Sequence, residues 1–134
     1  RYTDKELPEG FAAVMLVLSN IRDTNDKFGR AAGNRSIQEF SVMISTACTE
    51  LGFVGRNGGN KFLAFFEKSE EVDGKDKARL FIDRINTRVD AYNEDGSNPP
   101  LKYAYGVSTW KQIEKKDIYS LITCADNALM EKFD

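Results

Sequence analysis

The sequence predicts an α+β domain with a central, mainly antiparallel sheet flanked by helices. An unbroken apolar run at residues 11–18 is typical of a buried central strand. Two strand-like runs flank a Gly-Gly pair within residues 53–66, which is the pattern of a β-hairpin. Segments with apolar residues at helical spacing separate these strands along the chain. This alternation favours one sheet with helices packed on its faces.

Each predicted strand has its own pattern. Residues 11–18 read FAAVMLVL, so both faces of this strand are expected to be buried. The hairpin of residues 53–66 is expected to turn at Gly58 and Gly59, because glycine adopts a positive φ without a steric penalty. Residues 101–108 alternate between larger apolar and smaller or polar side chains, which is the period of a half-buried strand.

Helical periodicity appears in the remaining segments. Residues 19–29 predict a short helix that ends at a glycine. Asn34 is predicted to cap a long helix. The apolar positions of this helix are Ile37, Phe40, Ile44, Ala47, Cys48 and Leu51. A second long helix is marked by Ala78, Phe81, Ile82, Ile85, Val89 and Tyr92, and a last one is predicted from about Asp117 to Phe133.

Two polar segments lie between these elements. Residues 67–77 predict a solvated loop, whose acidic side chains are interpreted as surface charge rather than as ligands. Residues 93–100, which read NEDGSNPP, are expected to break the preceding helix. The predicted order of elements is therefore strand, helix, helix, hairpin, helix, strand, helix.

Composition limits the function classes. The 134 residues are expected to form one domain (1–134), with 41% hydrophobic and 30% charged residues as in ordinary globular proteins. A net charge of −2 without a basic stripe argues against a nucleic-acid polymer as a partner. The chain has no histidine, which removes the commonest general base and the commonest transition-metal ligand.

The cysteines and the apolar runs bear on location. Cys48 and Cys124 lie far apart in apolar helical patterns, so we expect two buried thiols in a reducing compartment rather than a disulfide. No apolar run approaches the ~20 residues of a membrane helix, which predicts a cytoplasmic domain. The abrupt start at Arg1 predicts a domain excised from a larger multidomain signalling protein, with a sensor or a membrane anchor among its expected other parts.

Six short motifs follow one another in a recognisable order. They are VLSNIRDTND (17–26), Gly29-Arg30, Gly33-Asn34, RNGGNKF (56–62), Tyr105-Gly106-Val107 and CADNALM (124–130). In this order and spacing they resemble the GGDEF family of diguanylate cyclases, which is named after its Gly-Gly-Asp/Glu-Glu-Phe hairpin. The resemblance extends from residue 11 to residue 133. It implies the nucleotidyl-cyclase palm fold, which has a ferredoxin-like core.

The resemblance also implies a magnesium site, from which this chain departs. In the family, an Asp of the first strand and the acid after Gly-Gly hold the Mg²⁺ ions that bind the GTP phosphates. Val17 and Asn60 stand at these positions, and Lys61 adds a positive charge beside them. Because Mg²⁺ takes oxygen ligands, we expect no metal site, no cofactor and no catalytic residues. The chain is interpreted as a degenerate GGDEF domain, with GGNKF in place of GGDEF.

Nucleotide binding depends on other residues. The resemblance places Asn25 at a guanine contact, and Asn34 at a second one where the family has Asp. Gly58 and Gly59 would let a phosphate approach the backbone, and Lys61 would bring a cation to where the metal's charge was. These five residues form the candidate site for GTP or another purine nucleotide. In the alternative interpretation, Asn25 and Asn34 are only helix caps.

A second family site is an Arg-x-x-Asp sequence upstream of the hairpin, which binds cyclic di-GMP as an inhibitor. Thr49, Glu50, Leu51 and Gly52 occupy its positions, without the Arg that bidentate contact requires. We therefore expect no product feedback at this surface.

Three functions follow from these observations. The first is a non-catalytic GGDEF-like signalling module in bacterial cyclic-dinucleotide signalling, which binds a purine nucleotide weakly and regulates a neighbouring sensor or phosphodiesterase domain. The second is an active diguanylate cyclase that converts two GTP molecules to cyclic di-GMP. The third is a structural dimerisation domain, whose partner is a second copy of the chain. The replaced carboxylates favour the first over the second, whereas the sequence hardly separates the first from the third.

Overall fold

The computed structural model describes residues 5–56 and 58–133, so Asn57 of the predicted hairpin turn lies outside the described residues. Its strands are β1 (Ala12–Leu18), β2 (Phe53–Arg56), β3 (Lys61–Phe66) and β4 (Tyr103–Thr109). Its helices are α1 (Ile21–Phe28), α2 (Arg30–Cys48), α3 (Gly74–Asp95) and α4 (Ile118–Met130). Short 3₁₀ turns follow β4 at Trp110–Gln112 and α4 at Glu131–Phe133. The predicted order of elements is confirmed.

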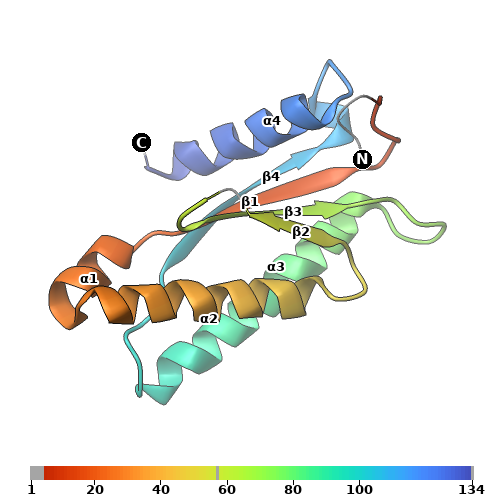
Figure 1. Ribbon diagram of the computed structural model, residues 1–134. Helices are drawn as coiled ribbons and strands as arrows, with labels where there is room; N and C mark the ends of the chain where they lie inside the picture. Colours follow the sequence, from red (N-terminus) through yellow and green to blue (C-terminus); the bar gives the residue numbers. More distant parts are fainter. Residues whose placement is uncertain (1–4, 57, 134) are drawn as a thin grey trace.

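The strands form one antiparallel sheet in the order β2-β3-β1-β4. β1 is central, since Val14 lies opposite Ala64 of β3 on one side and Val107 of β4 on the other. Helices α2 and α3 pack on one face of this sheet and α4 packs on the other (Figure 1). The predicted fold class, an α+β domain with a mainly antiparallel sheet, is confirmed.

The side chains of β1 serve two separate hydrophobic cores. Leu16 packs with Phe40 of α2 in the core under α2 and α3. Met15 packs with Leu121 of α4 in the core on the other face. Successive side chains of a strand point to opposite faces, so only an unbroken apolar run can fill both cores. Full burial of each large apolar side chain stabilises the fold by about 1.5–3 kcal/mol.

The second helix begins earlier than predicted. It starts at Arg30, so Asn34 is the fifth residue of α2 and not its cap. Gly29 has a φ of +92°, and its carbonyl accepts the Gly33 amide at 3.3 Å. A single glycine can therefore turn the chain from α1 into α2 without a longer loop. Asn25 lies in the middle of α1, so the cap interpretation is wrong for this residue as well.

The predicted loop of residues 67–77 is too long, because α3 already begins at Gly74. The Gly74 amide donates to the Gly10 carbonyl at 3.0 Å. A Cβ at position 74 would lie 2.3 Å from that oxygen, so the close approach requires glycine. At its other end α3 continues to Asp95, and Gly96 ends it in the left-handed conformation with a φ of +74°.

The last strand begins at Tyr103, two residues later than predicted. Asn93 explains the difference. Its side chain donates to the Leu101 carbonyl at 2.9 Å and accepts the Leu101 amide at 2.8 Å. Leu101 is buried as its apolar character predicts, but its backbone pairs with a side chain instead of a strand.

Both cysteines are free thiols, in agreement with the predicted lack of a disulfide. Cys48 is buried, and burial raises the pKa of its thiol to about 11, so little thiolate forms near neutral pH. Cys124 is half-buried, and the prediction of burial is wrong for it because it lines a hollow beside α4. Within the described part of the chain, no helix is both long and apolar enough to cross a membrane.

Candidate functional site

The β2–β3 turn lies at the end of the sheet where β1 finishes, and we call Leu18 and residues 58–61 the hairpin end. Gly58 and Gly59 have φ values of +79° and +52°, the positive region expected for them. A Cβ on either glycine would meet nothing within 4 Å, so the backbone here is open to approach. The Lys61 amide closes the turn by donating to the Gly58 carbonyl at 3.0 Å.

The fold brings together Val17 and Asn60, the two positions that the resemblance equates with the family's metal ligands. Val17 pairs with Lys61 in the register of β1 and β3, next to Asn60. The Leu18 amide donates to the backbone carbonyl of Asn60 at 3.0 Å. The Asn60 side chain then donates Nδ2 to the Leu18 carbonyl at 2.6 Å. Since a carbonyl only accepts, the nitrogen of this amide, and not its oxygen, faces β1.

The ammonium of Lys61 is held by an acid from another element. Its Nζ lies 3.3 Å from Oδ1 of Asp126 on α4, and the two side chains are 36% and 39% exposed. A pair at this exposure contributes about 1 kcal/mol or less. Sequence reasoning included Asp126 only within a motif and missed this contact, because 65 residues separate the partners. The signal in the sequence was a lysine at a position where the family has an acid. Such a lysine suggests an acidic partner elsewhere in the fold.

Asn25 and Asn34 come from neighbouring helices, and we call Asn25, Gly33 and Asn34 the helix corner. Asn25 packs so closely on α2 that a Cβ at Gly33 would lie 1.7 Å from its Oδ1. This oxygen is buried, and it has no hydrogen-bond partner within the described ranges. Asn34 is exposed on the next position of α2. A buried acceptor without a partner costs about 1–3 kcal/mol, so packing rather than polar pairing holds Asn25 in place.

Another asparagine fixes the helix corner relative to the hairpin end, and sequence reasoning did not identify it. Asn20 donates Nδ2 to the Pro100 carbonyl at 2.8 Å and accepts the Lys102 amide at 3.3 Å. The Ser19 amide donates to the Lys102 carbonyl at 2.8 Å. The connection from Leu18 into α1 is thereby tied to the chain that enters β4.

Residues 49–52, which replace the family's Arg-x-x-Asp, follow α2 and lead into β2. An arginine does lie beside them, but it comes from α3. Arg84 donates from Nη1 to the carbonyls of Ala47 and Thr49 at 3.1 and 3.2 Å. These carbonyls belong to the end of α2, where the last carbonyls of a helix have no amide donor within the helix itself. Arg84 therefore has a structural contact that accounts for its position.

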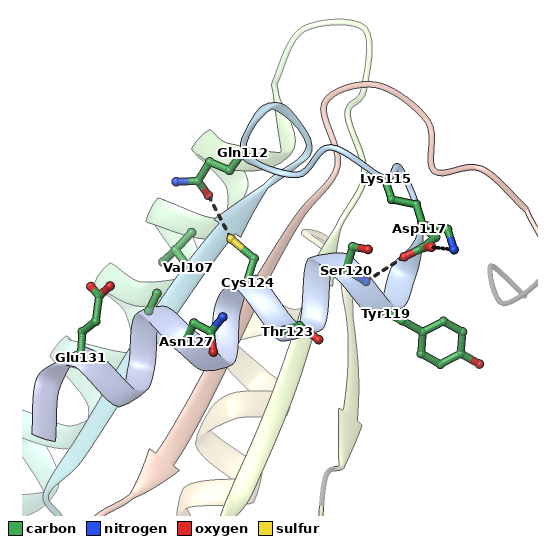
Figure 2. Close-up of a pocket in the computed structure, with 11 residues that line it drawn as sticks. Val107, Gln112, Lys115, Asp117, Tyr119, Ser120, Thr123, Cys124, Asn127 and Glu131 are labelled. Carbon is green, nitrogen blue, oxygen red and sulfur yellow. Dashed lines mark hydrogen bonds and ion pairs between the residues drawn. The ribbon is translucent and has the colours of Figure 1, made fainter. Parts of the chain in front are cut away.

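A separate hollow of about 700 Å³ lies beside α4, and none of the hairpin-end residues lines it. Figure 2 shows contacts around Asp117 and between Gln112 and Cys124, whereas Asn127 and Glu131 are drawn without one. Asp117 accepts the Ser120 amide at 2.8 Å and lies 3.5 Å from Lys115 Nζ. The Ser120 bond, with a smaller effect of Lys115, lowers the pKa of Asp117. The Sγ of Cys124 lies 3.9 Å from Gln112 Oε1. Asp117 and Lys115 pair with each other here, and Glu131 adds a carboxylate at the other end of the hollow.

The hairpin end and the helix corner together offer hydrogen-bonding groups and one cation. Among residues 5–56 and 58–133, no three His, Cys, Asp or Glu side chains gather as a metal site would require. The groups present are an open glycine backbone, the exposed amide of Asn34 and the ammonium of Lys61. Chemically, these suit contacts with a phosphate or with the polar edge of a base.

Fold and site together define a class, the nucleotidyl-cyclase palm domains, in which a glycine hairpin, the end of a central strand and the first helices meet. Within that class, the chain belongs to the GGDEF family. Residues 3–132 match the family model described as "Diguanylate cyclase, GGDEF domain". The resemblance inferred from the six motifs is thereby confirmed.

Individual relatives agree with this assignment. An uncharacterised 19.3 kDa protein in the repSA 5′ region of Streptomyces ambofaciens is 28% identical over 120 residues, covering 88% of this chain and 61% of that protein. The chain thus spans less than two thirds of this curated relative. The GGDEF domain of TpbB, or YfiN, from Pseudomonas aeruginosa has a TM-score of 0.73 at 21% identity, covering 90% of this chain and 69% of that one. The active GGEEF domain of a diguanylate cyclase from Vibrio cholerae has a TM-score of 0.72 at 20% identity, covering 90% and 74%. At these identities the two structures establish the fold alone.

Proposed function

We propose that this GGDEF domain makes no cyclic di-GMP and works as a signalling module, which binds a purine nucleotide weakly without a metal ion and regulates a neighbouring domain. The observation that carries this proposal is the 2.6 Å hydrogen bond from Asn60 Nδ2 to the Leu18 carbonyl. It directs an N–H donor, rather than an oxygen ligand, toward the end of β1 at the family's metal position.

The residues of the hairpin end do not suit Mg²⁺. This ion demands a near-octahedral set of oxygen ligands. Val17 has no side-chain oxygen, and the amide nitrogen of Asn60 is the group that faces β1. Lys61 adds a positive charge, which opposes a cation in the same space. Losing transition-state electrostatics of this kind costs roughly 3–4 kcal/mol per interaction, or about 10²–10³ in rate.

Retained groups support weak nucleotide binding. The exposed amide of Asn34 offers a hydrogen-bond donor and an acceptor at the helix corner, whereas Oδ1 of Asn25 is buried against Gly33. Gly58 and Gly59 leave room for a phosphate beside the backbone. Lys61 can balance phosphate charge, but it shares its ammonium with Asp126. This competition is the reason for proposing a weak affinity.

The first experiment measures catalysis. Purified protein is incubated with GTP and Mg²⁺ or Mn²⁺, and cyclic di-GMP is quantified by chromatography. We expect no product above a blank without protein. Product formation that disappears with Asn25→Ala would establish the alternative, an active diguanylate cyclase.

A second experiment measures binding of GTP, GDP and ATP by calorimetry, with and without EDTA. We expect EDTA to leave the affinity unchanged, Lys61→Met to lower it, and Asp126→Asn to raise it by releasing Lys61. Lys27→Met is the matched control, because Lys27 forms a comparable exposed pair with Asp23 at 3.4 Å. Binding that EDTA abolishes would contradict metal independence. If no nucleotide shifts the melting temperature at millimolar concentration, the dimerisation or contact-signalling function replaces this proposal.

Regulation of a neighbouring domain is part of the same proposal. The Lys61–Asp126 pair joins the hairpin end to α4, so a phosphate that takes Lys61 would release Asp126. We expect the neighbour to be a sensor or a phosphodiesterase domain, in the cytoplasmic part of a bacterial protein that is anchored in the membrane. Hydrogen exchange along α4, compared with and without GTP, tests this link; an unchanged α4 under saturating nucleotide would contradict it.

A further inference from the structure

A second hollow lies at the opposite end of the sheet from the hairpin end. β1 and β4 pair from Leu18↔Tyr103 at the hairpin end to Ala12↔Thr109 at the other, and the hollow of about 550 Å³ lies beside this second pair. Three lysines line it. They are Lys68 after β3, Lys75 in the first turn of α3, and Lys111 in the 3₁₀ turn after β4. We call this place the lysine hollow.

Close backbone packing places two of these lysines. Gly10 has a φ of +82°, and a Cβ there would lie 2.7 Å from both Cβ and Cδ of Lys68 and 3.0 Å from Oδ1 of Asp73. The stem of Lys68 therefore lies across the bare backbone of Gly10. The Gly10 carbonyl also accepts the Gly74 amide at 3.0 Å, which fixes the start of α3 and with it the position of Lys75.

The lysine hollow contains more positive than negative side chains. Within residues 5–56 and 58–133, Lys68, Lys75 and Lys111 have no carboxylate within the 4.0 Å of an ion pair. Glu9 and Asp73 also line the hollow. Asp73 precedes α3 but makes no capping hydrogen bond with its side chain. The hollow thus presents three ammonium donors and two carboxylate acceptors.

Trp110 is a further lining residue of the hollow, and its ring is held in place on the side of the sheet that α4 covers. Trp110 donates from Nε1 to the Leu7 carbonyl at 3.0 Å and from its amide to the Phe11 carbonyl at 2.8 Å. Lys116 lies 4.0 Å from the centroid of the same ring. Val107 adds an aliphatic side chain. Pockets that take small molecules measure about 300–1,000 Å³ and combine an apolar wall with a few placed polar groups, and the lysine hollow has both properties.

We propose that the lysine hollow binds a small phosphorylated polyol, either a free sugar phosphate or the sugar-phosphate part of a nucleotide. Ammonium groups bind phosphate oxygens through charge-assisted hydrogen bonds. The carboxylates of Glu9 and Asp73 accept hydrogen bonds from hydroxyl groups, which a bare phosphate does not supply in the same number. The aliphatic side chain of Val107 can contact the carbon skeleton. This site is independent of nucleotide binding at the hairpin end, because the two places share no residue.

The single tryptophan of the chain is among the residues that line this hollow, so its fluorescence serves as the reporter. Fluorescence of Trp110 is titrated with ribose 5-phosphate, ribose, inorganic phosphate and ADP. We expect a saturable change with ribose 5-phosphate, and an affinity at least about tenfold lower for ribose and for inorganic phosphate, since each lacks one set of contacts. Similar affinities for ribose 5-phosphate and ADP identify the sugar phosphate as the recognised part, and much tighter ADP binding identifies a nucleotide.

Variants then locate the binding. Lys68→Gln/Lys111→Gln should lower the affinity for ribose 5-phosphate about tenfold or more. Lys27→Gln/Lys102→Gln, a matched pair of exposed lysines at the other end of the sheet, should leave it unchanged. Circular dichroism confirms that both proteins fold, and Lys75→Gln serves as a single substitution if the first pair unfolds. An unchanged Trp110 signal, inorganic phosphate bound as tightly as ribose 5-phosphate, or equal losses in both variant pairs would overturn the proposal.

Discussion

The two ends of the sheet differ in whether their polar and charged side chains are bonded to other groups of the chain. At the hairpin end, Asn60 is bonded to the Leu18 carbonyl and Lys61 is paired with Asp126. At the lysine hollow, no carboxylate among the described residues lies within ion-pair distance of Lys68 or Lys111. The groups at the family's metal position contact the chain itself, whereas the opposite end keeps charges available for a ligand.

This difference teaches that family motifs and binding capacity need not coincide. The hairpin has its two glycines at positive φ, but Asn60 bonds the Leu18 carbonyl and Lys61 pairs with Asp126. The three lysines of the lysine hollow belong to none of the six motifs. A fold does not by itself determine where a ligand binds. Ligand binding at each end therefore has to be tested by changing the charged residues found there.

The largest expected effect lies in the helix corner. Gly33→Ala places a methyl group where Asn25 Oδ1 lies, 1.7 Å from the new carbon. We expect a loss of about 1–3 kcal/mol in urea unfolding, as for overpacked cores, although alanine is by about 1 kcal/mol the better helix former. In an Asn25→Ala background the same change should be neutral or stabilising. Equal losses in both backgrounds would show that Asn25 does not cause the constraint.

A metal-ion experiment addresses the hairpin end. Mg²⁺ should leave the melting temperature of the natural protein unchanged. Val17→Asp/Asn60→Asp puts two carboxylates at the end of β1, and Mg²⁺ at 100 times its dissociation constant would then add about 2.7 kcal/mol. Differential scanning calorimetry with Mg²⁺ and with the same ionic strength of Na⁺ separates specific binding from screening. A Mg²⁺-specific rise in the melting temperature of the natural protein would show that the hairpin end does bind a metal ion.

Removing the Lys61–Asp126 pair should have a smaller effect. Both side chains are more than a third exposed, so Lys61→Met and Asp126→Asn should each change the free energy of unfolding by about 1 kcal/mol or less. The double variant should lose no more than either single one, because both remove the same contact. Additive losses in urea unfolding would mean that the two residues act through other partners.

The smallest effect is expected at the lysine hollow. Lys68→Gln/Lys111→Gln should change stability by less than about 0.5 kcal/mol, because both side chains are exposed and neither forms an ion pair within the described ranges. Thermal unfolding without any ligand measures this. A loss above 1 kcal/mol would mean that these lysines hold the fold together rather than remain free for a ligand.

Much of the fold could be predicted because strands and helices each have a characteristic spacing of apolar residues in the sequence. Residues 11–18 favoured a central strand, since a short unbroken apolar run fits a strand that is buried on both faces. The start of α3 could not be predicted in the same way. It depends on the contact between Gly74 and Gly10, which lie far apart in the sequence. The late start of β4 likewise depends on the side chain of Asn93.

By itself, the sequence determined the order of elements and the glycine hairpin, because both are local patterns; the expectation that Val17 and Asn60 stand in place of two acids came from the resemblance to the family. Only the tertiary structure decided which groups meet. The bond from Asn60 to Leu18, the pair of Lys61 with Asp126, and the gathering of three lysines from three segments all join distant parts of the chain. Partner choice depends on distances of a few ångströms, because hydrogen bonds and ion pairs lose most of their strength beyond them.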